Sequence, residues 1–166
     1  MLVLAVISDT HLPRGRRRLP DACVERLAAA DLILHAGDFV AVSVLEEIAG
    51  IGPPLHAVHG NVDELEVAMR VPAARMVRAE GARIAMVHDA GAAAGRLARM
   101  RRRFPDADAV VFGHSHIPLH EQEGGGGFQI FNPGSPTDRR RQPRHTMGVA
   151  RVEDGRVQFE LIDLGP

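Results

Sequence analysis

Short apolar runs alternate with polar segments along the first two thirds of the chain. Residues 2–7, LVLAVI, form a continuous apolar run that predicts a buried strand. Further apolar runs predict strands over residues 32–35, 55–58, 75–79, 83–87 and 109–112. Between these runs, start and stop signals predict helices over residues 20–30, 42–49 and 91–103. Strands that alternate with helices indicate an α/β fold with a mainly parallel sheet.

The last third of the chain contains apolar runs that no helical pattern separates. Strands are predicted over residues 119–122, 128–131, 147–152 and 157–162. We therefore expect this tail to form a second, more antiparallel sheet. Two connections carry clear turn signals: Glu80-Gly81 predicts a tight hairpin, and the four glycines at 124–127 suit a flexible hairpin tip.

Length and composition favour one globular domain over residues 1–166. Hydrophobic residues make up 45% of the chain and charged residues 25%, and the formal net charge is −1. Such a balance provides no overall field that would attract nucleic acid or a membrane. The single cysteine, Cys23, excludes an internal disulfide, and the run at 2–7 is too short to span a membrane. We expect a cytoplasmic protein.

Five of the predicted strands are followed by residues that bind metals or phosphates. These are Asp9-Thr10-His11, Gly37-Asp38, Gly60-Asn61-Val62-Asp63, His88-Asp89 and Gly113-His114-Ser115-His116. Ligands bind at the carboxyl ends of strands in α/β sheets, so one fold would bring all five groups together. Carboxylate, imidazole and amide ligands together suit Mn²⁺, Fe²⁺, Zn²⁺ or Co²⁺ better than Ca²⁺ alone.

The spacing within these motifs adds detail. Glycines before Asp38, Asn61 and His114 allow the chain to turn sharply and to approach a metal closely. The two residues of Asp9-x-His11, like the two histidines that follow Gly113, are expected on one side of an extended segment. Each motif alone is weak evidence, because a lone strand-end histidine is usually structural. Their coincidence at five strand ends predicts a metal site.

The ordered set of motifs resembles the calcineurin-like metallophosphoesterases. The sequences at 60–63, 113–116 and 132–135 (Asn-Pro-Gly-Ser) are similar to the small YfcE-type phosphodiesterase branch, to which the retromer subunit Vps29 is related. The resemblance extends from Ser8 to about Arg140. It implies a four-layer α/β/β/α sandwich, with two mixed sheets flanked by helices.

The resemblance further implies a centre of two divalent cations. Mn²⁺ is expected first, with Fe, Zn, Ni and Co as alternatives. One ion is assigned to Asp9, His11, Asp38 and His116, and the other to Asp38, Asn61, His88 and His114. Asp38 would bridge the ions, and a bridging hydroxide would hydrolyse a small phosphate ester, most simply a diester. Asn61, His88 and Arg14 are the expected substrate contacts.

The residue that protonates the leaving group is left open by the sequence. Many relatives have a histidine directly after the asparagine, where Val62 stands here. We therefore consider His59, Asp63 and water as candidates, with Asn61 in the same catalytic set. Asp63 has an alternative role in holding a turn or orienting a ligand, and His59 has a structural alternative.

Several other basic residues have simpler structural explanations. Arg14 with Arg16–Arg18, and Arg139–Arg141, either clamp a phosphate oxygen or form solvated surface. The basic stretch at 91–103 has no interleaved aromatic residue, which argues against nucleic acid as a partner. His35 and His56 lie within apolar strands, which favours a core position.

The sequence allows two alternative functions and does not determine the oligomeric state. A catalytically silent interaction module of the Vps29 kind is disfavoured because every expected ligand position is filled. A phosphomonoesterase or protein phosphatase is disfavoured because the chain is too short for a large substrate-recognition insert. A homo-oligomer is left open.

Overall fold

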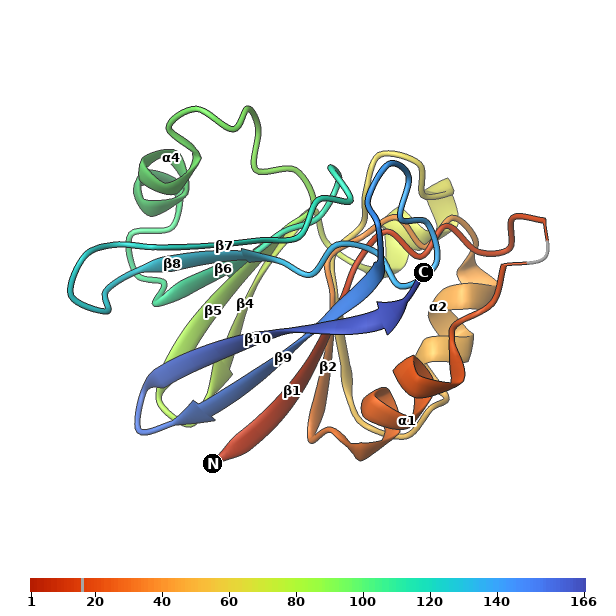
Figure 1. The fold of residues 1–166 in the computed structure, drawn as a ribbon, viewed down its shortest axis with the longest axis horizontal. Coiled ribbons are helices and arrows are strands. Elements are labelled where there is room, and N and C mark those ends of the chain that lie inside the picture. The colour runs from red at the N-terminus through yellow and green to blue at the C-terminus, as the bar shows by residue number, and fades with distance from the viewer. Residues whose placement is uncertain (16) are drawn as a thin grey trace.

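Two β-sheets pack face to face, with helices on both outer faces (Figure 1). The computed structural model describes residues 1–15 and 17–166. Each sheet has five strands and contains both parallel and antiparallel pairs. The expected four-layer α/β/β/α sandwich is thereby confirmed.

The first sheet combines early strands with the last two strands of the chain. It contains β1 (Leu2–Ile7), β2 (Leu32–His35), β3 (Leu55–Ala57), β9 (His145–Glu153) and β10 (Arg156–Gly165), in the order β10-β9-β1-β2-β3. β1, β2 and β3 are parallel, and β9 is antiparallel to both neighbours. Its outer face is covered by α1 (Asp21–Ala29), α2 (Val42–Ala49) and α3 (Leu65–Arg70) (Figure 1).

The second sheet is built from the middle of the chain. It contains β4 (Ala74–Ala79), β5 (Ala82–Val87), β6 (Ala109–Val111), β7 (Leu119–Gln122) and β8 (Gln129–Asn132), in the order β4-β5-β6-β8-β7. β5, β6 and β8 are parallel, whereas β4 and β7 are antiparallel edge strands. α4 (Arg96–Arg103) lies over its outer face (Figure 1).

Three hydrophobic clusters fill the three interfaces between the four layers. Side chains alternate between the faces of a strand, so a strand buried on both faces contributes to two clusters. In β1, Leu4 and Val6 point into the core between the sheets, whereas Ala5 and Ile7 pack against α1 and α2. Strand β5 does the same on the other side of the molecule. This double burial explains why these strands read as continuous apolar runs.

The carboxyl ends of all six parallel strands meet at one edge of the sandwich. β1, β2 and β3 lead into the motifs at 9–11, 37–38 and 60–63. β5 and β6 lead into those at 88–89 and 113–116. β8 leads into Asn132-Pro133-Gly134-Ser135. All of these motifs therefore lie along the edge where the two sheets face each other.

The prediction that the strands after residue 118 form a second sheet of their own is wrong. β7 and β8 join the second sheet, but β9 and β10 join the first sheet beside β1. β8 is also parallel to β6 rather than part of an antiparallel tail. Apolar periodicity identifies a strand and its buried face, but it contains no information about which sheet the strand enters.

Two helices differ most from the prediction. The helix expected over 91–103 begins only at Arg96, after a loop with positive φ at Gly91 and Gly95. α3 was not predicted, because it has only 6 residues. The hairpin at Glu80-Gly81 is confirmed, with both residues at positive φ, and the glycines at 124–127 do connect β7 to β8. No helix in the described ranges has the length and apolar character needed to cross a bilayer.

Candidate metal centre

Two histidines and one aspartate form the first group of potential ligands. The Nε2 atoms of His11 and His116 lie 3.1 Å apart, and His116 Nε2 lies 3.4 Å from Asp9 Oδ1. All three side chains are buried. The first motif after β1 and the motif after β6 therefore meet across the interface between the sheets, as the sequence predicts.

Asp38 connects this group to the remaining predicted ligands. Its Oδ2 lies 3.4 Å from His11 Nε2 and 3.3 Å from His88 Nε2. Asn61 Oδ1 then lies 3.1 Å from His88 Nε2 and 2.9 Å from His114 Nδ1. Thus the structure brings together all seven side chains expected to bind metal.

Both buried carboxylates lie between the two halves of the centre. Asp38 contacts a histidine of each half. Asp9 belongs to two compact groups, one with His11 and His116 and one with Asp38 and His88. The resemblance assigned a bridging position to Asp38 only, whereas the geometry places both aspartates near the middle.

Hydrogen bonds behind the centre fix how two of the imidazoles face it. His88 Nδ1 donates to the carbonyl of Ala36 at 2.7 Å, and His116 Nδ1 donates to the carbonyl of Asp138. A carbonyl only accepts, so each imidazole in its neutral form keeps its lone pair on Nε2, directed at the centre. This is the arrangement that a metal-binding histidine requires.

The donor set and its spacing fit divalent cations. Two ligand atoms bonded to one ion at about 2.0–2.2 Å are separated by about 3.0–3.5 Å in octahedral or tetrahedral geometry. The separations of 3.1–3.4 Å among these side chains match that range. Asp9 and Asp38 are also almost fully buried, and among residues 1–15 and 17–166 only imidazoles form ion pairs with them. Buried carboxylates in such a position favour a cation.

Burial and neighbouring charges separate the two aspartates electrostatically. Burial raises the pKa of Asp9 to about 7. Burial also acts to raise the pKa of Asp38, but the hydrogen bond and charge of His88 outweigh it and hold that pKa at about 2. In the metal-free protein at neutral pH, Asp38 is therefore fully ionised, whereas the Asp9 carboxyl is partly protonated.

We expect metal binding to release more protons at about pH 6 than at about pH 8. Because burial raises the pKa of Asp9 to about 7, its carboxyl holds a proton below that pH and must lose it to bind a cation. Metal affinity should then fall about tenfold per pH unit for each proton displaced. Calorimetric titration with Mn²⁺ in two buffers of different ionisation enthalpy counts the protons. Equal release at both pH values would contradict the role given to Asp9.

The ligand-bearing segments are not extended, which corrects one expectation. Asp9, His11, His114 and His116 adopt positive φ values between 47° and 67°. Asp38 does so as well, at 62°. Such conformations are uncommon outside glycine and cost about 1–3 kcal/mol each, and they concentrate at functional sites. The paired side chains converge because the backbone winds around the centre, not because alternate residues share one face of a strand.

The backbone at the three glycines lies close to the loops of the candidate centre. A Cβ atom on Gly60 would lie 2.1 Å from Asp38 Oδ1, and one on Gly113 would lie 1.9 Å from Ser8 Oγ. Gly37 has a φ of 96° and contacts the backbone of Gly60. Glycine is therefore required by space at all three positions, and at Gly37 by backbone conformation as well.

Gly60→Ala is expected to displace the Asp38 carboxylate and to weaken metal binding at least about tenfold. The φ of Gly60 is not in the positive range, so the effect is steric, with an overpacking cost of about 1–3 kcal/mol. Metal affinity by calorimetry and thermal melting measure it. Gly124→Ala, which meets no atom within 4 Å, is the matched control. A lower Tm with unchanged metal affinity would show that Asp38 is not a ligand.

Asp63 is fully occupied with the backbone of the two neighbouring loops. Its Oδ2 accepts from Gly60 N at 2.7 Å and Asp38 N at 3.1 Å, and its Oδ1 accepts from Val40 N at 2.7 Å. A carboxylate that accepts three backbone N–H groups is poorly suited to deliver a proton. The geometry favours the alternative role, in which Asp63 clamps the loop of Asp38 to the loop of Asn61.

The other predicted catalytic and substrate residues lie around the rim. His59 is half-buried, and its Nδ1 lies 3.4 Å from the carbonyl of Gly60. Arg14 is exposed on the loop that follows His11. Asp89 accepts from Gly91 N, and its Oδ2 lies 4.0 Å from His114 Nε2. Arg16 lies outside the described residues.

Several buried supporting residues were missed or undervalued by sequence reasoning. Ser135 Oγ donates to the carbonyl of Asp9 at 2.7 Å and accepts from Asp138 N at 2.8 Å, so the loop after β8 supports the centre directly. His35 is buried in the core as expected, but it also accepts from Gly37 N and pairs with Thr10 Oγ1 at 3.2 Å. The sequence feature that could have identified them is their position: Ser135 follows a parallel strand, and His35 ends one.

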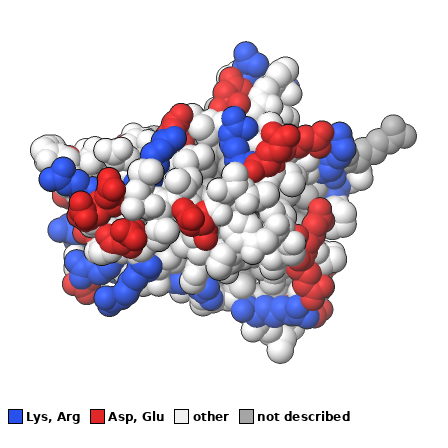
Figure 2. All heavy atoms as spheres, turned by 90° about the horizontal axis from the view of Figure 1, so that it is seen from below, with Lys and Arg blue, Asp and Glu red and all other residues white. Residues whose placement is uncertain are grey.

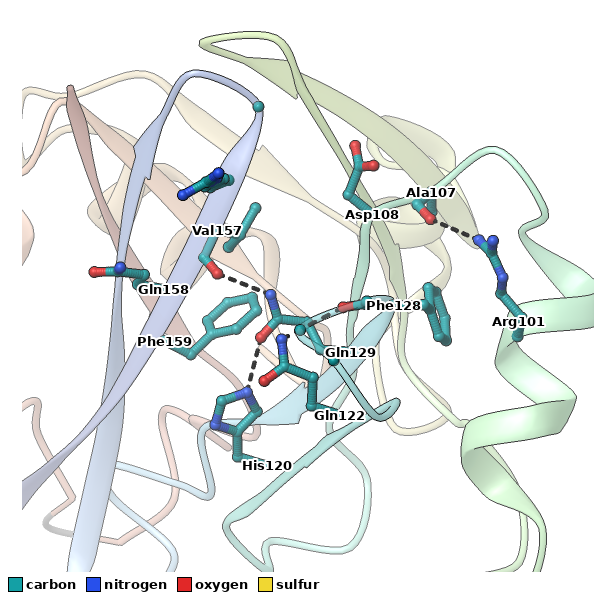
Figure 3. A pocket seen from close by; sticks show the side chains of 15 residues that line it. Arg101, Ala107, Asp108, His120, Gln122, Phe128, Gln129, Val157, Gln158 and Phe159 are labelled. Atoms are coloured by element: carbon teal, nitrogen blue, oxygen red, sulfur yellow. Dashed lines mark hydrogen bonds between the residues drawn. The ribbon is translucent and has the colours of Figure 1, made fainter.

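A cavity of about 830 Å³ lies away from the centre, between the β7–β8 and β9–β10 hairpins (Figure 3). None of the seven predicted ligands lines it. At its floor, Gln129 donates to the carbonyl of Val157 and pairs with His120, while Arg101 donates to the carbonyl of Ala107. These polar groups are already satisfied within the protein, and the bond from Gln129 to Val157 connects the two sheets.

Comparison with known proteins agrees with this architecture. Residues 1–155 match the model of the calcineurin-like phosphoesterase superfamily domain. A probable metallophosphoesterase from Methanothermobacter thermautotrophicus is 30% identical over 99% of this chain and 94% of its own. Zinc-bound Vps29 from Entamoeba histolytica has a TM-score of 0.76 at 21% identity, covering 99% of this chain and 100% of its own. An archaeal phosphodiesterase has a TM-score of 0.71 at 20% identity, covering 97% and 100%.

Proposed function

The chain belongs to the calcineurin-like phosphoesterase superfamily, and on that premise we propose that it is a phosphodiesterase that uses two divalent cations. The observation that supports this most is the convergence of seven ligand-type side chains from five strand ends, with Asp38 in contact with both halves. The archaeal phosphodiesterase with the same fold supports the choice of a diester substrate.

The residues of the chain have separate tasks in this proposal. Asp9, Asp38, Asn61 and the histidines would hold the cations, which supply Lewis-acid charge and an activated water when bound. Hydrogen bonds to backbone carbonyls hold His88 and His116 in the metal-binding tautomer without any movement. Arg14, which is exposed on the loop after His11, would contact the substrate. His59 is the remaining side-chain candidate for protonating the leaving group, since Asp63 is committed to the backbone.

A catalytically silent module of the Vps29 kind is the competing function, because Vps29 shares the fold. The observation that favours an enzyme is that the ligand set is filled and its atoms are spaced for cations. Mn²⁺ is proposed as the first choice of metal, and Zn²⁺ is the alternative suggested by the zinc-bound relative.

Hydrolysis by the Mn²⁺-reconstituted protein tests the proposal directly. We expect about two ions per chain and faster cleavage of bis(p-nitrophenyl) phosphate than of p-nitrophenyl phosphate. The reason is that the short chain has no insert that would close a pocket around a monoester. Faster cleavage of the monoester would overturn the diesterase assignment, and a metal content near zero with an intact fold would favour the silent module.

A further inference from the structure

Two turns that carry arginines lie beside the half of the centre formed by His11 and His116. The first follows His11 and is closed by a hydrogen bond from Arg17 N to the carbonyl of Arg14 at 3.2 Å. The second follows the loop after β8 and is closed by a hydrogen bond from Gln142 N to the carbonyl of Arg139 at 2.8 Å. The turns come from opposite ends of the sequence.

The two turns are fixed to each other and to the centre through Asp138. Arg17 Nη1 lies 3.3 Å from Asp138 Oδ2, which forms an ion pair between the turns. The carbonyl of Asp138 accepts the hydrogen bond from His116 Nδ1. One residue therefore holds both the arginine turns and a predicted ligand, so the position of these turns relative to the centre is set.

Three arginines on these turns have free guanidinium groups. Arg14, Arg140 and Arg141 are exposed, and within residues 1–15 and 17–166 none of them has a hydrogen-bond or ion-pair partner. Arginines of α4 contrast with them, since Arg96 and Arg99 donate to backbone carbonyls of the loop at 90–94. The three free guanidinium groups are thus available to a ligand.

Two of the arginines stand close to groups of the centre. Arg14 stands three residues after His11, and Arg140 stands two residues after Asp138, whose carbonyl accepts from His116 Nδ1. Over the whole chain, in contrast, acidic and basic residues nearly cancel, with a formal net charge of −1. Figure 2 shows this balance on the face seen from below, where arginine and acidic side chains are intermingled. The excess of positive charge is local to this side of the centre.

We propose that the substrate carries a second phosphate group, which Arg14, Arg140 and Arg141 bind beside the centre. The inference rests on the proposed function. The scissile diester has one negative charge, which the cations would neutralise, so three further guanidinium groups exceed what a simple diester needs. Arginine forks match phosphate oxygens in geometry and charge. The expected substrate class is a nucleotide-like phosphodiester that carries an additional phosphate.

A chromogenic pair of nucleotides isolates the second phosphate. Thymidine 5′-(p-nitrophenyl phosphate) and its 3′-phosphorylated form share the same scissile bond and leaving group. With the Mn²⁺-loaded protein, we expect KM about tenfold lower for the 3′-phosphorylated form, with little change in kcat. In the exposed double variant Arg140→Ala/Arg141→Ala, the KM difference should shrink to about twofold. The double variant Arg78→Ala/Arg102→Ala removes two exposed arginines elsewhere and should leave the difference unchanged.

A third compound, with the 3′-phosphate methylated, identifies the source of the second phosphate. A low KM for the methylated compound would show that the arginines accept an internal diester of a longer chain. A raised KM for the methylated compound would show that they require a terminal phosphate. Equal KM values for the phosphorylated and unphosphorylated compounds in the unaltered protein would overturn the proposal. A KM difference that persists in Arg140→Ala/Arg141→Ala would do the same.

Binding to the metal-free protein tests the arginines without catalysis. We expect thymidine 3′,5′-bisphosphate to bind more tightly than thymidine 5′-monophosphate in calorimetry, with the preference lost in Arg140→Ala/Arg141→Ala. If no compound is hydrolysed, the proposed function fails, but the binding preference for the bisphosphate still tests the arginine site. Equal binding of the two nucleotides would overturn the arginine site even if hydrolysis is observed.

Discussion

The Asp38→Asn variant is expected to lose at least one of the two metal ions and nearly all turnover, while its fold persists. Asp38 is held ionised, with a pKa of about 2, and its Oδ2 lies within 3.4 Å of His11 and His88. An amide keeps one oxygen but loses the charge, and its NH₂ group repels a cation. Metal affinity should fall more than about 100-fold, beyond the range for losing an outer partner of a ligand. Calorimetry and bis(p-nitrophenyl) phosphate turnover measure both effects.

Two further variants make this result specific. Asp108→Asn removes a charge at the opposite end of β6, where Asp108 accepts from Arg83 N, and should leave metal content and turnover intact. His59→Ala should retain both ions and lower turnover by at most about 10²–10⁴-fold, the usual range for an acid–base group. If Asp38→Asn keeps two ions and near-normal turnover, the proposed centre is misplaced.

Asp63→Asn should lower both Tm and metal affinity, because it breaks the clamp between two ligand loops. The amide oxygen can keep two of the three backbone hydrogen bonds, but the NH₂ group would then face the N–H of Val40, which needs an acceptor. A buried donor left unsatisfied costs about 1–3 kcal/mol. Urea unfolding of the metal-free variant measures this loss, and metal titration measures the effect on the centre.

The same variant separates a clamp from a general acid. If Asp63 were a general acid, its replacement would lower turnover about 10²–10⁴-fold and leave stability and metal affinity unchanged. Asp31→Asn is a suitable control for the stability measurement, since Asp31 accepts a single backbone hydrogen bond, from Val3 N, far from the centre. Unchanged stability and affinity in Asp63→Asn, with turnover lost, would restore Asp63 as the proton donor.

The sequence was informative wherever one physical cause dominates. β1 and β5 are buried on both faces, so they read as unbroken apolar runs. Parallel strands deliver their carboxyl ends to one edge, so the position of five motifs at strand ends was sufficient to predict that the motifs meet, whereas the division of the ligands between two ions came from the family resemblance. His11 and His116 are 105 positions apart, yet their Nε2 atoms lie 3.1 Å from each other.

The parts that were not predicted depend on contacts distant in sequence. The assignment of β9 and β10 to the first sheet depends on the free edge of β1, which no local pattern records. The role of Asp63 depends on three N–H groups from two loops. The positive φ values of Asp9 and His116 are uncommon outside glycine and are maintained by the surrounding packing.

The pairing of β1 with β9 determines the order in which the protein can be completed during synthesis. β1 has β2 as an early partner, but its other edge pairs with β9, with Leu4 opposite Ala150. Every predicted ligand, from Asp9 to His116, precedes β9 in the sequence. A nascent chain therefore contains the whole centre while the inner edge of β1 is still open, and open edges promote pairing with other chains. Aggregation during translation should thus depend on how quickly the β9–β10 hairpin docks.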